Sequence, residues 1–217
     1  MEIKKDQKTY AFIDASNLCY GGKKSLGWMI DHQKLFKYLQ NKYNVSRFLY
    51  FGGIEVHDYE YDYLKNETVD VSLVKAYLEE YIKINGKQII DTELILFNIS
   101  IKKANFYLKL KQFGFELWLK PVKKYPQDDG SEKSKSNCDV DMAFLLMREK
   151  EKFDNAIIIS GDGDFLPVLK YLRKEGKNIT ILARGGRAAK EIKQFAKDNF
   201  RDFEYLKYIL QREVKKE

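Results

Sequence analysis

Five aspartates occupy positions where a folded chain could gather negative charge: Asp14 ends the run YAFID, Asp139 and Asp141 open the pattern DVDMAFLLM, and Asp162 and Asp164 follow the apolar run NAIII. Bringing two carboxylates within ~4 Å costs about 4 kcal/mol at an effective dielectric of ~20. A cluster of such residues therefore indicates a bound cation. All-oxygen ligands with retained waters suit Mg²⁺ or Mn²⁺, and such sites most often run in-line displacement at phosphorus.

The elements that position these residues follow an alternating β/α pattern, which predicts an α/β fold with a parallel sheet. In such a sheet, ligand sites lie outside the carboxyl ends of the strands. We expect a polar loop over 123–137 and an ambiguous, tyrosine-rich segment over 54–99. The expected strands are 10–14, 46–52, 115–120, 155–160, 178–183 and a short one near 203–206, and the expected helices are 31–43, 100–114 (capped by Ser100), 139–152, 165–176 and 188–199.

Each aspartate also has a purely structural interpretation. Asp14 could hold the next residues in an Asx-turn, and Asp164 or Asp139 could cap the helix that follows. Asp141 stands two residues after Asp139, so the two point to different faces of a helix, and we expect Asp141 not to be a ligand. The joint occurrence of these acids at strand ends in one chain favours a site.

Composition narrows the class of protein. The 217 residues are 44% hydrophobic and 33% charged, the balance of a globular chain. This length suits one domain with a substantial core or one domain carrying a large insertion. No apolar stretch resembles a signal peptide or a membrane span, so we expect a cytoplasmic protein without membrane contacts. Two cysteines and two histidines without ligand spacing argue against zinc sites, disulfide scaffolds and His-dependent triads.

Charge is distributed unevenly along the chain, which has a net charge of +7. Residues 101–137 carry nine lysines and four acids, and residues 165–201 carry ten Lys or Arg and three acids. These segments are either walls of a phosphate-attracting groove or solvated lysine-rich surfaces. Residues 54–99 carry ten acids against four lysines, which favours a lid or a contact with a protein partner.

Three motifs carry a resemblance to a known family. FIDASN, the K-x-x-x-D-V-D pattern from Lys135 to Asp141, and IISGDGDFLPVLKYLRKEGKNITILA resemble the ordered motifs of the NYN domain, the LabA-like branch of the PIN-domain nucleases. The resemblance covers residues 9–53 and about 100–207. It implies a PIN-like three-layer α/β/α sandwich with a mainly parallel sheet.

The domain organisation follows from the same resemblance. We expect a single domain over 1–207, an insertion or lid at about 54–99, and a charged tail over 208–217. Two positions depart from the family: Ala15 replaces the usual glycine after the first acid, and Cys138 stands where an aliphatic residue is usual.

The resemblance assigns the site residue by residue. Asp14 matches the first acid, Asp139 the acid after the lysine-bearing loop, and Asp162 and Asp164 the final pair. Asn17 matches the asparagine that accompanies the first acid.

The activity implied is divalent-metal-dependent cleavage of RNA, with single-stranded DNA as a further possible substrate. The four aspartates would hold one or two Mg²⁺ or Mn²⁺ ions and leave 5′-phosphate and 3′-hydroxyl ends. Asn17 and Ser160 would orient ligands or water, and Lys135, Arg184 and Arg187 would contact the phosphate backbone.

Three alternatives remain open. A haloacid-dehalogenase-type phosphotransferase also places an aspartate after its first strand, but needs a second acid where Ser16 stands here. A catalytically idle RNA-binding module would keep the basic segments. A protein-interaction domain could use the tyrosine-rich stretch HDYEYDY (57–63). The sequence does not determine the oligomeric state.

Overall fold

The computed structural model describes residues 7–21, 27–127, 132–136 and 138–213, without the side chains of 19–21, 124 and 132–135. Within this part of the chain, no helix is long and apolar enough to cross a membrane. The chain comprises two compact units. The first comprises Met1–Phe51, Gly114–Glu116 and Asp139–Glu217, and the second Gly52–Phe113 and Leu117–Cys138.

A six-stranded sheet has the order β3-β2-β1-β6-β7-β8. The pairings of β1 with β2 and β6, of β6 with β7, and of β7 with β8 are all parallel. This confirms the expected α/β class. The strands are β1 (Thr9–Asp14), β2 (Val45–Ile54), β3 (Phe115–Pro121), β6 (Asn155–Ile159), β7 (Asn178–Ala183) and β8 (Phe200–Asp202).

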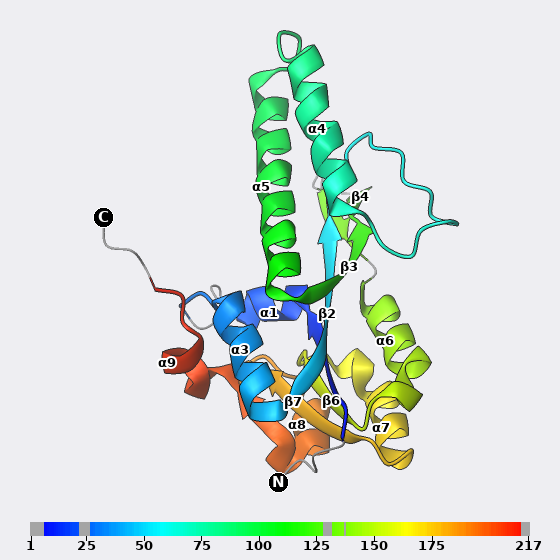
Figure 1. Cartoon of the computed structure of the whole chain (residues 1–217), viewed down its shortest axis with the longest axis vertical. Coiled ribbons are helices and arrows are strands. Elements are labelled where there is room, and N and C mark those ends of the chain that lie inside the picture. The colour runs from blue at the N-terminus through cyan, green and yellow to red at the C-terminus, as the bar shows by residue number, and fades with distance from the viewer. Residues whose placement is uncertain (1–6, 22–26, 128–131, 137, 214–217) are drawn as a thin grey trace. The chain divides into compact units, whose positions relative to one another are not determined.

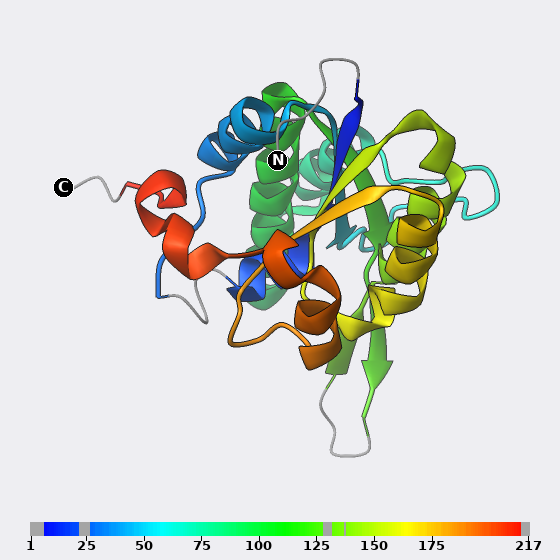
Figure 2. The ribbon, with the colours of Figure 1, turned by 90° about the horizontal axis from the view of Figure 1, so that it is seen from below.

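The central strands are the most deeply buried part of the first unit. Every residue of β1 and β6 is buried, as expected for parallel strands covered on both faces. Figure 2 shows α3 on one side of the sheet and α7 on the other, so the first unit has three layers, as a PIN-like sandwich does. Its helices are α1 (Ala15–Gly21), α3 (His32–Tyr43), α6 (Cys138–Arg148), α7 (Leu166–Lys174), α8 (Lys190–Ala196) and α9 (Lys207–Leu210).

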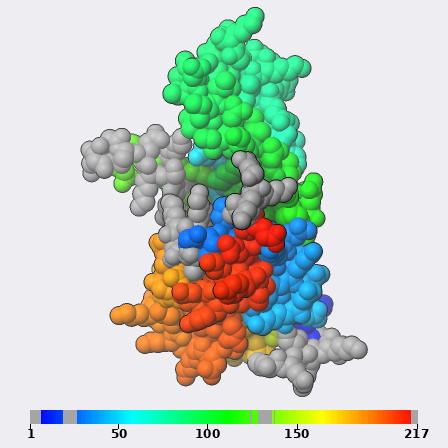
Figure 3. Space-filling model, turned by 90° about the vertical axis from the view of Figure 1, so that its left-hand side faces the viewer, coloured from blue at the N-terminus to red at the C-terminus, as the bar shows by residue number. Residues whose placement is uncertain are grey.

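Helix α3 shows how local sequence sets the boundaries of an element. The Asp31 carboxylate accepts hydrogen bonds from the backbone N–H groups of Gln33 and Lys34, which are otherwise unsatisfied at a helix start. Asn44 ends the helix in the left-handed conformation with φ 51°. The Asp31 N–H donates to the Leu210 carbonyl of α9 at 2.8 Å, and Figure 3 shows the C-terminal segment (red) beside this helix (blue).

The second unit contains a helical hairpin, in which α4 (Val71–Asn85) lies beside α5 (Asp91–Phe113). The sequence predicted a helix from 100 with Ser100 as its cap, and this boundary is wrong. No glycine or proline interrupts residues 91–113, so the helix continues through the ambiguous apolar stretch and ends before Gly114 at φ 103°. Ser100 is buried in mid-helix, with its Oγ 2.8 Å from Nε2 of His57.

Two other boundaries differ from expectation. The expected polar loop over 123–137 contains an antiparallel hairpin of β4 (Lys123–Pro126) and β5 (Glu132–Lys135). The last strand comes earlier than expected, because residues 203–206 form a 3-10 turn in which Asp202 accepts a hydrogen bond from the Glu204 N–H.

Candidate active site at the carboxyl ends of β1 and β6

The order of the strands reverses between β1 and β6. The chain runs outward from β1 to β2 and β3 on one side, and then returns to β6 on the other side of β1. In open parallel sheets, ligands bind where the order reverses in this way, outside the carboxyl ends of the strands. Ile13 pairs with Ile159, so Asp14 and Ser160 follow side by side at that point.

Asp14 is a buried carboxylate, only 5% exposed. Its Oδ1 accepts from the backbone N–H groups of Ser16 at 2.9 Å and Asn17 at 3.1 Å, and its Oδ2 accepts from the Ser160 hydroxyl at 3.1 Å. Desolvation by burial raises the pKa of Asp14 above its usual range despite these hydrogen bonds, and the negative charge of Asp162 raises the pKa further. The Asx-turn is therefore present, and it holds a charge that the protein interior disfavours.

Asn17 and Ser160 tie the end of β1 to the loop after β6. The Asn17 Oδ1 accepts from the backbone N–H of Gly161 at 3.1 Å. The Ser160 hydroxyl donates to Asp14 and also accepts from the Asp162 N–H at 3.2 Å. Both side chains therefore fix the position of Asp14 relative to the glycine-rich loop.

The two acids of the loop have different local roles. Asp162 caps the 3-10 turn η2 (Gly163–Phe165), since its Oδ1 accepts from the Asp164 N–H at 3.0 Å. The interpretation of Asp164 as the cap of the next helix is wrong, because Asp164 lies inside the turn and Phe165 precedes α7. The carboxylate of Asp164 is exposed.

The glycines of this loop allow the start of α8 to approach closely. A β-carbon on Gly161 would lie 2.9 Å from the Cα and Cβ of Ala188, and the Ala189 N–H donates to the Gly161 carbonyl at 2.9 Å. A β-carbon on Gly163 would overlap the Oε1 of Glu191, in the first turn of α8. Glu191 is thus a carboxylate beside the loop that sequence reasoning missed, because only tertiary packing brings it there.

Asp139 and Asp141 lie in the first turn of α6. Within the described residues, no three His, Cys, Asp or Glu side chains lie close enough together to hold a metal ion. Among the four predicted acids, the negative charge of Asp162 acts on Asp14.

The predicted phosphate contacts lie in both units. Arg184 follows β7 and is ion-paired with Glu204, with Asp202 Oδ1 4.0 Å from its Nη1. Arg187 is exposed in the next loop, where its N–H donates to the Arg184 carbonyl. Lys135 ends β5 of the second unit, and its side chain lies outside the described part of the chain.

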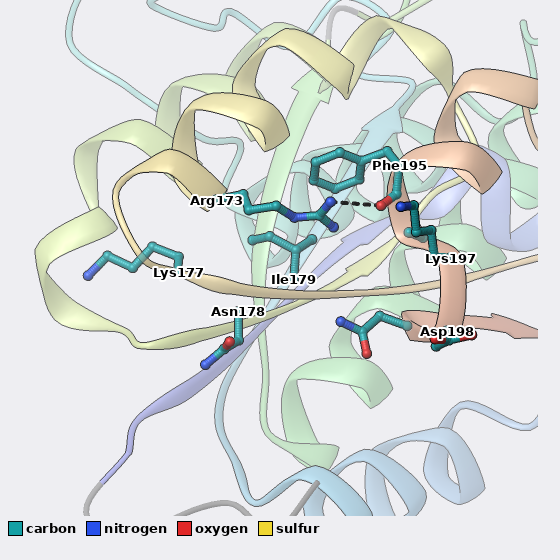
Figure 4. A pocket seen from close by; sticks show the side chains of 9 residues that line it. Arg173, Lys177, Asn178, Ile179, Phe195, Lys197 and Asp198 are labelled. Atoms are coloured by element: carbon teal, nitrogen blue, oxygen red, sulfur yellow. Dashed lines mark hydrogen bonds between the residues drawn. The ribbon is translucent and has the colours of Figure 1, made fainter.

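A cavity of about 370 Å³ lies at the other end of β7, beside Asn178. The Arg173 guanidinium carbon stacks 3.4 Å from the centroid of the Phe195 ring, and the guanidinium donates to the Phe195 carbonyl at 2.8 Å (Figure 4). Lys177 points away from Arg173 in the same view. Because Asn178 begins the strand and Arg184 follows its end, this cavity is separate from the acidic edge.

Fold and site together define a PIN-like α/β sandwich with an acidic edge at the reversal of strand order. The NYN domain family matches residues 58–204, more than half of the chain, and the chain belongs to this family. The match includes Asp139, Asp162 and Asp164, whereas Asp14 and Asn17 precede it.

Two proteins show similarity over most of the chain. The Low amplitude and bright protein LabA of Synechococcus elongatus is 21% identical over 203 residues, which are 93% of this chain and 86% of LabA. A protein of unknown function from Vibrio parahaemolyticus has a similar crystal structure, with a TM-score of 0.55 and 16% identity over 89% of this chain and 91% of that one. This second likeness shows the fold alone.

Proposed function

We propose that this protein is a divalent-metal-dependent nuclease that hydrolyses phosphodiester bonds of RNA in the cytoplasm. The observation that carries the proposal is the buried Asp14 carboxylate at the β1/β6 reversal, with the charge of Asp162 acting on it. A protein interior disfavours two interacting negative charges unless a cation neutralises them. The NYN family supports a nuclease role, and PIN-like nucleases typically use divalent metals.

The residues at this edge fit Mg²⁺ or Mn²⁺. Mg²⁺ usually retains several waters and binds through one or two protein carboxylates, so Asp14 and Asp162 suffice as its protein ligands. Asp164 and Asp139 are the further acids that the family motif assigns to the site, and they complete the proposed set. A bound metal of this kind polarises the phosphate and lowers the pKa of a bound water.

The protein's own contribution is to orient Asp14 and to offset part of the cost of burying its charge with hydrogen bonds. Two backbone N–H groups occupy both lone pairs of Oδ1, and the Ser160 hydroxyl occupies one of Oδ2, which leaves Oδ2 a remaining lone pair for a ligand. Asn17 fixes the neighbouring loop through the Gly161 N–H. Arg184, Arg187 and Lys135 are proposed to contact the phosphates, contributing affinity rather than sequence selectivity.

The test measures cleavage of labelled single-stranded RNA and DNA by the full chain, with Mg²⁺, with Mn²⁺ and with a chelator. We expect metal-dependent cleavage of RNA by the wild type and its loss in Asp14→Asn and Asp162→Asn. Asp154→Asn is the matched control. Asp154 precedes β6 at its opposite end, where its carboxylate accepts only from the Lys8 N–H at 2.9 Å among the interactions described.

Two results would overturn the proposal. Equal cleavage in chelator and in metal would exclude metal-dependent hydrolysis. RNA binding without cleavage under any condition would instead establish a catalytically idle RNA-binding module, the second candidate. That candidate is supported by the two basic segments, since residues 101–137 carry nine lysines and residues 165–201 carry ten Lys or Arg.

A further inference from the structure

Helix α5 is apolar on two opposite faces. Phe97 and Ala104 are buried in the second unit, whereas Ile95 and Ile99 are 59% and 54% exposed and Phe106 is 38% exposed. The exposed three recur at spacings of four and seven residues, which places them on one face of a helix. A helix that is apolar all round is normally covered on all sides. The exposed apolar face of α5 therefore resembles a surface that a binding partner covers.

A negatively charged residue lies at one end of the apolar centre of this face, and a positively charged residue lies at the other end. Asp91 lies one turn before Ile95, and Lys102 lies one turn after Ile99. Both stand at helical spacing from the isoleucines, so they share the same face. Within the described part of the chain, no ion pair occupies either of them.

We propose that this face binds the same face of a second copy of the chain, with the two α5 helices antiparallel. An antiparallel copy centred near residue 97 places Ile95 against Ile99 of the other copy, and Ile99 against Ile95. The same register places each Asp91 against a Lys102. A two-fold contact requires a self-complementary surface, and the order acid, apolar, apolar, base is self-complementary only when the helices are antiparallel.

The ends of the contact agree with this register. Ile90, in the connection between α4 and α5, is 66% exposed, and the register brings it near Phe106 of the other copy. The exposed apolar residues on both sides of the isoleucine pair therefore become covered together. A parallel arrangement would instead place Asp91 against Asp91 and Lys102 against Lys102, which like-charge repulsion disfavours.

The contact uses one face of one helix, so it buries less than the ~800 Å² per partner of a standard interface. We therefore expect a reversible monomer–dimer equilibrium that depends on protein concentration. The face lies wholly in the second unit, and the inference does not depend on the proposed nuclease activity.

The test is sedimentation equilibrium of the full chain over a range of protein concentrations, at low salt. We expect wild type to dimerise and Ile95→Glu to raise the dimer dissociation constant at least about 100-fold, because each dimer would bury two unpaired charges. Leu73→Glu is the matched control. Leu73, on α4, is an apolar residue of similar exposure, at 54% against 59% for Ile95, and its variant should dimerise like wild type.

Charge reversal tests the antiparallel register. Asp91→Lys and Lys102→Asp should each dimerise poorly alone, because each substitution makes both contacts between a 91 and a 102 side chain in the dimer repulsive. Mixed together, the two variants should associate, since every contact between a 91 and a 102 side chain then joins a lysine to an aspartate. Circular dichroism establishes that each variant is folded.

Each unexpected result removes part of the proposal. A monomeric wild type at all concentrations overturns it. Dimers that persist in Ile95→Glu exclude α5 as the interface, and variants that fail to associate when mixed exclude the antiparallel register. Binding of RNA by a monomeric wild type that is lost in Ile95→Glu would assign the face to nucleic acid instead.

Discussion

Replacing Ser160 by alanine should destabilise the metal-free protein in a pH-dependent way. The Ser160 hydroxyl is buried and donates to Asp14 Oδ2. Burial raises the pKa of the Asp14 carboxyl, and this hydrogen bond lowers it. Without it, the charged form of Asp14 loses one of its three described donors. The Asp162 N–H also loses its described acceptor.

The magnitude follows from the charge on the acceptor. A hydrogen bond to a charged group contributes about 1.5–3 kcal/mol, against about 1 for a neutral pair. For a chain of this length, 1 kcal/mol corresponds to roughly 2–4 °C in Tm. We therefore expect Ser160→Ala to lower Tm by roughly 3–12 °C at a pH above the raised pKa of Asp14, where its carboxyl is ionised.

The sign of the pH dependence is set by the raised pKa of Asp14. Above that pKa the folded protein carries the buried charge of Asp14, and the stability difference between wild type and Ser160→Ala is largest. As the pH falls through it, Asp14 takes up a proton in the folded state and the difference between wild type and variant shrinks. Below the raised pKa of folded wild-type Asp14 the carboxyl is neutral in both folded proteins, and the charge-dependent part of the difference is lost; the unfolded carboxyl titrates alike in both proteins and cancels.

The assay compares melting of wild type and variant in chelator between about pH 8 and the lowest pH at which both stay folded. Burial lowers the pKa of His32 to about 4, but this titration occurs in both proteins and cancels in the difference. Ser46→Ala is the control, because Ser46 donates to the neutral Thr9 carbonyl at 3.1 Å and should show a small, pH-independent cost. An equal cost for Ser160→Ala at every pH would refute the reasoning.

Three further predictions concern the same edge of the sheet. Asp162→Asn keeps the oxygen that caps the turn and removes the negative charge that acts on Asp14, so melting in chelator should give a stability equal to or above that of wild type. At a metal concentration of 100 Kd the order of stabilities should reverse, because wild type gains about 2.7 kcal/mol from binding. Unchanged melting of wild type on adding metal would contradict this. Gly161→Ala should cost about 1–3 kcal/mol in urea unfolding, because its β-carbon meets Ala188 at 2.9 Å; a stability like wild type would show that α8 shifts freely. In an RNA cleavage assay, Asp139→Asn should abolish activity and Asp141→Asn should retain it. Circular dichroism establishes that both variants are folded. Equal losses of activity would show that the wrong acid of the pair was assigned.

Sequence alone predicts the α/β class and most element boundaries, because they rest on local signals. The buried runs of β1 and β6 are continuously apolar, and Asp31 and Asn44 mark the two ends of α3. It fails where local signals are ambiguous. The apolar stretch before Ser100 has no strand-like alternation and no breaker, and packing against α4 and His57 decides that it is helix.

Sequence also predicts the acids of the candidate site, since aspartates that follow apolar runs are visible without a structure. It does not determine which of them meet. The strand order that puts β6 beside β1 joins Asp14 to Ser160 and Asp162 across 146 and more residues, and close packing at Gly163 brings in Glu191. Burial is likewise a property of the whole fold: Asp14 is a short polar residue in the sequence, and only the layers around the sheet remove it from water and raise its pKa.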